Sequence, residues 1–110
     1  MFEVDDYNNI FLTRGDTGIF TVTLLDDEGQ PFVPTEGDSI RFAMAKKYGA
    51  SSDVLINKQF PVDTLTLEIE PDDTKHLPFG DYVYDIEYTD SDGHVSTVII
   101  AKISLTKEVY

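Results

Sequence analysis

Apolar and polar residues alternate with a period of two in several short segments of this 110-residue chain. Successive side chains of a β-strand point to opposite faces of a sheet, so this period predicts strands with one buried face. Segments 19–25, 39–45, 65–69 and 81–89 show it most clearly, and turns rich in glycine, proline and aspartate separate them. About seven strands at intervals of about 8 to 15 residues predict an all-β sandwich or barrel.

Each alternating segment predicts a row of inward side chains. The rows are Phe20, Val22 and Leu24; Ile40, Phe42 and Met44; Leu65, Leu67 and Ile69; Tyr82, Tyr84, Ile86 and Tyr88; and Ile99, Ala101, Ile103 and Leu105. Residues 54–60 predict a weaker strand at a sheet edge, where Lys58 helps to block pairing with other chains. Residues 46–53 predict an exposed loop.

A single helical turn interrupts the strands near residues 71–77. Proline at the first helical position loses no needed hydrogen bond, and Asp72 and Asp73 complement the positive end of a helix. Pro78 and Gly80 stop the segment after one or two turns.

Length and charge bound the remaining options. Residues 1–110 fit one domain, and the absence of cysteine excludes disulfides and thiolate metal sites. The net charge of −13 disfavours binding to nucleic acids or anionic membranes. The acidic start of the chain lacks the pattern of a signal peptide, and no apolar run approaches a membrane span. We therefore expect a protein made in the cytoplasm.

The entry into the 81–89 segment carries a specific signal. Leu77, Gly80 and Tyr82 follow a short acidic turn, in a spacing that resembles the tyrosine corner of immunoglobulin-like domains. There the tyrosine hydroxyl bonds back to the preceding connection. The alternative reading is that Tyr82 is one of four stacked core residues. The corner favours an immunoglobulin-like antiparallel β-sandwich.

Four stretches together resemble a known family. They are Arg14-Gly15-Asp16-Thr17 with Phe20-Thr21-Val22, Asp27-Glu28-Gly29-Gln30-Pro31 with the 37–42 strand, Pro71-Asp72-Asp73-Thr74 with Leu77, and Gly80 to Ile86. The chain is similar to small immunoglobulin-like proteins of phages and prophages, such as the N-terminal domain of upper baseplate proteins from phages of Gram-positive bacteria. The resemblance implies a virion structural role in a tail, baseplate or head decoration. It also implies a location in the host bacterial cytoplasm and then in the virion.

Residues that could carry chemistry are sparse. His76 and His94 lie in a helical turn and beside a hairpin turn, where surface or capping roles are expected. A catalytic histidine needs an orienting partner and a cleft, so we expect no catalysis and no cofactor. Asp90, Asp92 and Gly93 resemble the opening of a calcium loop, yet turn chemistry explains them without a metal. The triplet Arg14-Gly15-Asp16 is explained as a turn rather than as an integrin ligand.

A surface is the most informative functional hint. If the strand order is immunoglobulin-like, segments 39–45, 81–89 and 95–105 share one sheet. Alternation then places small apolar residues on its outward face, namely Ala43, Ala45, Val83, Val98 and Ile100. Such a face on an acidic protein is a candidate site for docking or for self-association into a homo-oligomer.

Two function classes follow. The first is a non-catalytic structural or assembly module of a bacteriophage or prophage particle, whose partners are other phage structural proteins or itself. The second is an acidic, phage-encoded inhibitor that mimics DNA and blocks a host DNA-binding protein. A carbohydrate-binding module is a weaker option, because Tyr7, Tyr48 and Tyr110 are the expected exposed tyrosines and lie far apart in sequence.

Overall fold

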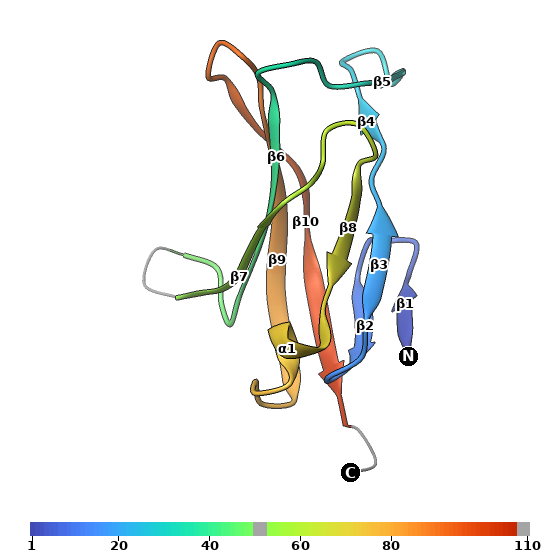
Figure 1. Ribbon diagram of the computed structural model, residues 1–110, viewed down its shortest axis with the longest axis vertical. Helices are drawn as coiled ribbons and strands as arrows, with labels where there is room; N and C mark the ends of the chain where they lie inside the picture. Colours follow the sequence, from blue (N-terminus) through green and yellow to red (C-terminus); the bar gives the residue numbers. More distant parts are fainter. Residues whose placement is uncertain (50–52, 108–110) are drawn as a thin grey trace.

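Ten β-strands and one helical turn make up the regular structure in the computed structural model, which describes residues 1–49 and 53–107 (Figure 1). The strands are β1 (Phe2–Val4), β2 (Ile10–Thr13), β3 (Gly18–Thr21), β4 (Leu24–Leu25), β5 (Pro31–Phe32), β6 (Ser39–Ala45), β7 (Val54–Gln59), β8 (Thr66–Ile69), β9 (Gly80–Thr89) and β10 (Val95–Thr106). The helical turn is α1 (Pro71–Thr74). The prediction of an all-β fold with one short helical turn is confirmed.

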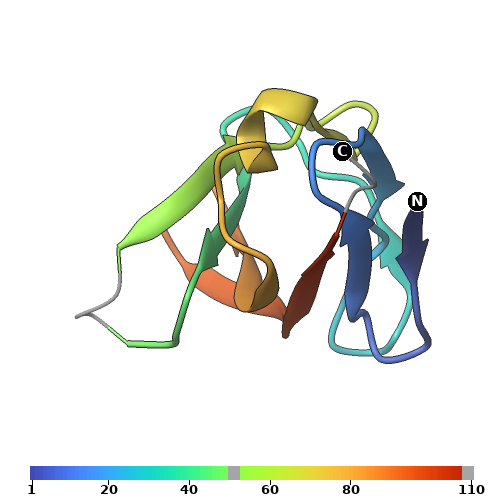
Figure 2. The same cartoon turned by 90° about the horizontal axis from the view of Figure 1, so that it is seen from below.

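Six of the strands form one sheet, in the order β1-β2-β10-β9-β6-β7. The strand β3 pairs with β8, and β4 pairs with β5. All of these pairs are antiparallel except β2 and β10, which run parallel. Figure 2 looks from below and shows the large sheet as a curved layer, with β3 and α1 on the opposite side. The early strand β2 and the late strand β10 are thereby neighbours.

The core lies between the large sheet and the β3–β8 pair. Ile40, Phe42 and Met44 of β6 are fully buried, and the predicted β9 row is buried or half-buried on the same side. Phe42 stacks on Tyr84 at 5.2 Å between ring centroids, and Phe20 of β3 meets Phe42 edge-on. These inward rows confirm the predicted alternation, and aromatic contacts of this kind add to the hydrophobic burial.

The turn α1 is tied to the loop that follows β2. Asp73 accepts a hydrogen bond from the Glu70 backbone N–H at 2.7 Å, which satisfies one of the free donors at the helix start. Thr74 is fully buried, and its hydroxyl accepts the Gly15 backbone N–H at 2.9 Å. Gly15 has a φ of +85°, so a side chain there would be strained. In addition, Asp16 donates its backbone N–H to Thr13, which confirms the predicted turn at residues 14–16.

The hydrogen bond predicted for Tyr82 is present. Its hydroxyl donates to the Pro78 carbonyl at 2.6 Å, back into the connection between α1 and β9. Lys46 lies over the face of the same ring, with its ammonium 4.6 Å from the centroid. The ring itself is buried, so Tyr82 both fills the core and fixes the path of the chain into β9.

We expect the Tyr82→Phe variant to lose about 1 kcal/mol of unfolding free energy, since it removes this hydrogen bond and keeps the ring. Urea denaturation followed by circular dichroism measures the difference. Tyr7→Phe is the matched control. Tyr7 is 82% exposed, so removal of its hydroxyl should leave the unfolding free energy unchanged. An unchanged stability in Tyr82→Phe would show that the hydroxyl has no structural role.

Several elements differ from the sequence predictions. The segment predicted as one strand over 19–25 is divided, because β3 pairs with β8 whereas β4 pairs with β5. The short strands β1 and β5 were not predicted. The edge strand predicted over 54–60 is present as β7, but Lys58 points inward, where it pairs with Asp73 at 2.7 Å and closes the gap to α1. An inward charge of this kind also protects a sheet edge.

Candidate interaction surface

Four of the five predicted surface residues lie on one face of the large sheet. Ala43 and Asp85 are directly opposite in β6 and β9, and Ile100 of β10 is opposite Asp85 on the other side. In the next row, Ala45 is opposite Val83. The alanines and Val83 are half-buried, whereas Ile100 is 62% exposed. The predicted outward face therefore exists, with Ile100 as its most exposed apolar member.

Val98 does not belong to this face, so its predicted orientation is wrong. The register of β10 against β9 shifts between Thr97 and Ile99, where a β-bulge inserts one extra residue. Ile99 is opposite the core residue Ile86, and Val98 lines hollows on the same inner side together with Leu25. A bulge breaks the period of two, which is why strict alternation from Ile103 placed Val98 on the wrong side.

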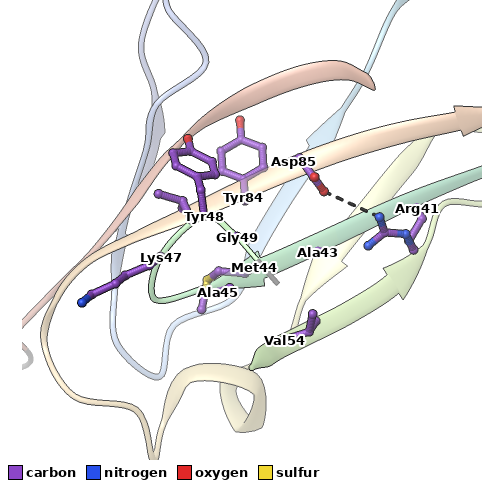
Figure 3. A pocket seen from close by; sticks show the side chains of 11 residues that line it. Arg41, Ala43, Met44, Ala45, Lys47, Tyr48, Gly49, Val54, Tyr84 and Asp85 are labelled. Carbon is purple, nitrogen blue, oxygen red and sulfur yellow. Dashed lines mark ion pairs between the residues drawn. The ribbon is translucent and has the colours of Figure 1, made fainter. Parts of the chain in front are cut away.

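The outward face contains a shallow hollow of about 170 Å³ (Figure 3). It lies over β6 and β9, at the start of the loop that leads to β7. Its lining includes three of the predicted residues, Ala43, Ala45 and Val83, together with Arg41, Lys47, Tyr48, Val54 and Asp85. Figure 3 shows Arg41 and Asp85 at one end of the hollow and Lys47 at the other. Small side chains on the strands leave this space, because alanine covers little of the sheet.

Tyr48 holds the loop after β6 to the sheet. Its hydroxyl donates to the Ala101 carbonyl of β10 at 3.2 Å, although the side chain stays 57% exposed. Of the loop predicted over 46–53, residues 50–52 lie outside the described part of the chain, as does Tyr110. Tyr7 belongs to the turn before β2. Tyr48 and Tyr7 therefore stand on different segments, which gives no support to a shared aromatic platform for sugars.

Three charged groups sit beside the hollow on the outward face. Arg41 forms an ion pair with Glu87, and its guanidinium nitrogen is 3.8 Å from Asp85 Oδ1. Among the described residues, that oxygen has no hydrogen-bond partner. Burial raises the pKa of Asp85, the charge of Arg41 opposes this, and the charge of Glu87 adds to it. Asp85 thus has one buried oxygen that relies on the nearby charge of Arg41 for compensation.

The sequence singled out Ala43 and Val83 but not Arg41, Tyr48 or Asp85. Their proximity depends on the register of β6 against β9 and on the path of the loop after β6, which no local pattern encodes. The only sequence signal was that Arg41, Asp85 and Glu87 alternate with the predicted core residues and so had to face outward.

The histidines and the 90–93 turn are explained by local structure. His76 and His94 are both exposed. Asp90 accepts the backbone N–H groups of Asp92 and His94, each at 2.9 Å, and the bond from His94 is the main cause of its lowered pKa. The carboxylates of Asp90 and Asp92 and the ring of His94 lie within 4.8 Å of one another. All three are at the surface, where the turn accounts for their positions.

No helix in residues 1–49 and 53–107 is long and apolar enough to cross a membrane. The chain matches no protein-family model and no curated protein sequence. The functional inference therefore rests on the surfaces of the molecule and on the resemblance of its motifs.

Proposed function

We propose that the chain is an immunoglobulin-like β-sandwich. In that fold the strands named C, F and G share one sheet, and B and E share the other. Here β6, β9 and β10 are neighbours in the large sheet, and β3 pairs with β8 across the core. The hydrogen bond from Tyr82 to Pro78, at the start of β9, has the form of a tyrosine corner at strand F. Together, the strand order and this bond support the assignment.

We further propose that the protein is a non-catalytic assembly module of a bacteriophage or prophage particle. Its motifs resemble phage structural proteins, and its partners would be other structural proteins of the particle or a second copy. The observation that carries the proposal is the outward face of β6, β9 and β10, where exposed Ile100 adjoins the hollow beside Ala43 and Val83. An apolar centre with a charged rim is typical of protein interfaces. The protein would be made in the host bacterial cytoplasm and then enter the virion.

The distribution of carboxylates favours this role over mimicry of DNA. A DNA mimic needs its acids along one face, at a spacing that matches phosphates. Asp26 and Asp27 lie in the β4–β5 turn, and Asp90 lies in the β9–β10 turn. Asp72 and Asp73 belong to α1, which Figure 1 shows at the opposite end of the molecule. These five acids therefore lie at two ends of the molecule, and Asp85 and Glu87 lie on the sheet between them.

Quantitative mass spectrometry of gradient-purified particles tests the assembly role. We expect the wild-type chain in particles at a constant ratio to the major structural proteins. Ile100→Glu should lower incorporation about tenfold, which corresponds to about 1.4 kcal/mol of lost binding. Tyr7→Glu, on an exposed turn outside the face, should leave incorporation unchanged. If particles lack the wild-type chain while it competes with DNA for a basic host protein, the inhibitor is the better explanation.

A further inference from the structure

The first two thirds of β10 have an open edge. β2 pairs with β10 only from Ile103 to Thr106, whereas β10 begins at Val95. Within the described residues, no strand is paired with this side of β10 between Val95 and Lys102. Figure 1 shows β1 and β2 beside the lower half of β10, while the β9–β10 hairpin continues upward past them. An unpaired strand edge is a ready template for another strand.

The direction of the backbone groups can be derived from one hydrogen bond. The Lys102 N–H donates to Asn9 Oδ1 at 3.1 Å, on the β2 side of β10. Backbone groups of alternate residues in a strand point to the same side, and no bulge lies between residues 100 and 102. The Ile100 N–H therefore points to the open edge. Asn9 occupies the position at which the pairing with β2 ends.

Two hollows with mixed polar and apolar linings flank this edge on its inner side. One has a volume of about 400 Å³ and is lined by Val22, Leu25, Ile86, Val98 and Ile99 among others. A second, of about 380 Å³, shares Leu25 and Val98 with the first and continues toward Phe32 and Tyr88. The bulge turns Val98 toward these hollows and leaves it 40% exposed. Pockets beside an open edge are what strand addition requires, because alternate side chains of the added strand fill them.

The charges around the hollows define the occupant. Asp26, Asp27 and Asp90 line the second hollow, and no basic residue is among the described lining residues of either one. The hydrogen bonds to Asp90 lower its pKa, so it carries its charge at neutral pH. A second copy of this chain would bring another net charge of −13 to an acidic rim. Charge complementarity therefore favours a basic strand over self-pairing.

We propose that the open edge of β10 between Val95 and Lys102 accepts an extended segment of a partner protein by strand addition. The segment has apolar residues at alternate positions, which enter the hollows beside Val98 and Leu25. At the end of the segment beside Val95, a lysine or arginine in the same inward-facing row meets the acids at 26, 27 and 90, which line the second hollow. This inference rests on the proposed function in one respect, namely that the partner is a protein. It adds the chemistry of the segment that this partner would supply.

Calorimetric titration of the full chain with a short valine–lysine peptide tests the proposal; one face of the peptide carries valines followed by a lysine, and the other face carries threonines. The peptide should bind, and hydrogen exchange should show new protection at the Ile100 amide. The same peptide, N-methylated on the amides that would face β10, should bind at least tenfold more weakly, since it keeps its charge but lacks the donors. The same peptide with glutamate in place of the lysine on the valine face should not bind. Equal binding of the methylated peptide, or binding of the acidic one, would overturn the proposal.

A pair of variants at one position tests the same edge from the protein side. Ile100→Pro removes the N–H that points outward and leaves the pairing with β9 in place, as edge positions tolerate. It should weaken binding of the valine–lysine peptide at least tenfold, whereas Ile100→Ala, which keeps the N–H, should change it less than threefold. If the proline variant does not fold, the binding of the three peptides to the wild type tests strand addition at β10.

Two further outcomes separate this proposal from the proposed function. Concentration-dependent self-association that Ile100→Pro abolishes would make a second copy the occupant and overturn the assignment of a basic segment. Particles that contain the chain, together with a failure to bind the valine–lysine peptide, would leave the assembly role standing and refute the open edge. Peptide binding by a chain that is missing from particles would support the open edge and refute the assembly role.

Discussion

Replacing Phe42 by alanine is expected to remove about 3–5 kcal/mol of unfolding free energy, the largest effect of any single change considered for this protein. The ring is fully buried in the middle of β6, stacks on Tyr84 and receives Phe20 edge-on. The variant loses the hydrophobic transfer energy of the ring, and the neighbouring strands cannot close the cavity because their backbones are paired. A domain of this kind has about 5–15 kcal/mol in total, so much of its stability depends on this ring.

Urea denaturation at neutral pH measures the loss. Phe79→Ala is the matched control, since it removes the same ring from a position that is 41% exposed and forms a cation–π contact with Arg14. We expect the control to lose about 1 kcal/mol or less. Similar losses in both variants would mean that Phe42 does not lie in the core as described.

The second large effect is a loss of stability at alkaline pH that depends on Tyr84. Burial raises the pKa of Tyr84 to about 12, and the nearby charge of Asp5 adds to the shift. Its hydroxyl donates to the Asn8 carbonyl. In the unfolded chain a tyrosine ionises with a pKa of about 10. Between these two values the folded state holds a proton that the unfolded state releases, so the stability present below pH 10 is lost as the pH rises through 12.

A difference of about two units corresponds to about 2–3 kcal/mol over that range. Between pH 10 and 12 the unfolding free energy of the wild type should fall by this amount more than that of Tyr84→Phe. At neutral pH the same variant should lose about 1 kcal/mol for the missing hydrogen bond. Urea denaturation at a series of pH values measures both effects. Some alkaline dependence should remain, because burial and the bond to Asp38 raise the pKa of Tyr88 to about 12 as well.

Tyr7→Phe provides the reference for alkaline effects that do not involve Tyr84. Its hydroxyl is at the surface, so the variant should follow the wild type across the whole series. Parallel stability curves for wild type and Tyr84→Phe above pH 10 would contradict the raised pKa.

Elements with a local sequence pattern were predicted most accurately. In β6, the alternation of Ile40, Phe42 and Met44 with Arg41 and Ala43 is regular, and the register confirms it. The position of α1 followed from a proline at the first helical position and the acids after it. Such signals act within a few residues of one another, so they can be read without knowing which strands are neighbours.

The candidate surface was predicted only in part, because it depends on contacts between distant segments. Alternation placed Ala43 and Val83 correctly. The bulge at Thr97–Ile99 puts Val98 on the other side of the sheet, and no turn residue in the sequence signals this bulge. Tyr48 is exposed as predicted, but the bond from its hydroxyl to Ala101, more than fifty residues away, could not be read from the sequence. The open edge of β10 arises because β2 is four residues long and β10 is twelve.

The parallel pairing of β2 with β10 also sets the order in which the chain can be completed. Ile10 is opposite Ile103, so more than ninety residues separate two strands that lie side by side. Closing so long a loop costs chain entropy before any contact offsets it, and folds with distant pairings form on the slow timescale of about milliseconds to seconds. A chain emerging from the ribosome therefore keeps β2 without this neighbour until residues 103–106 have been added.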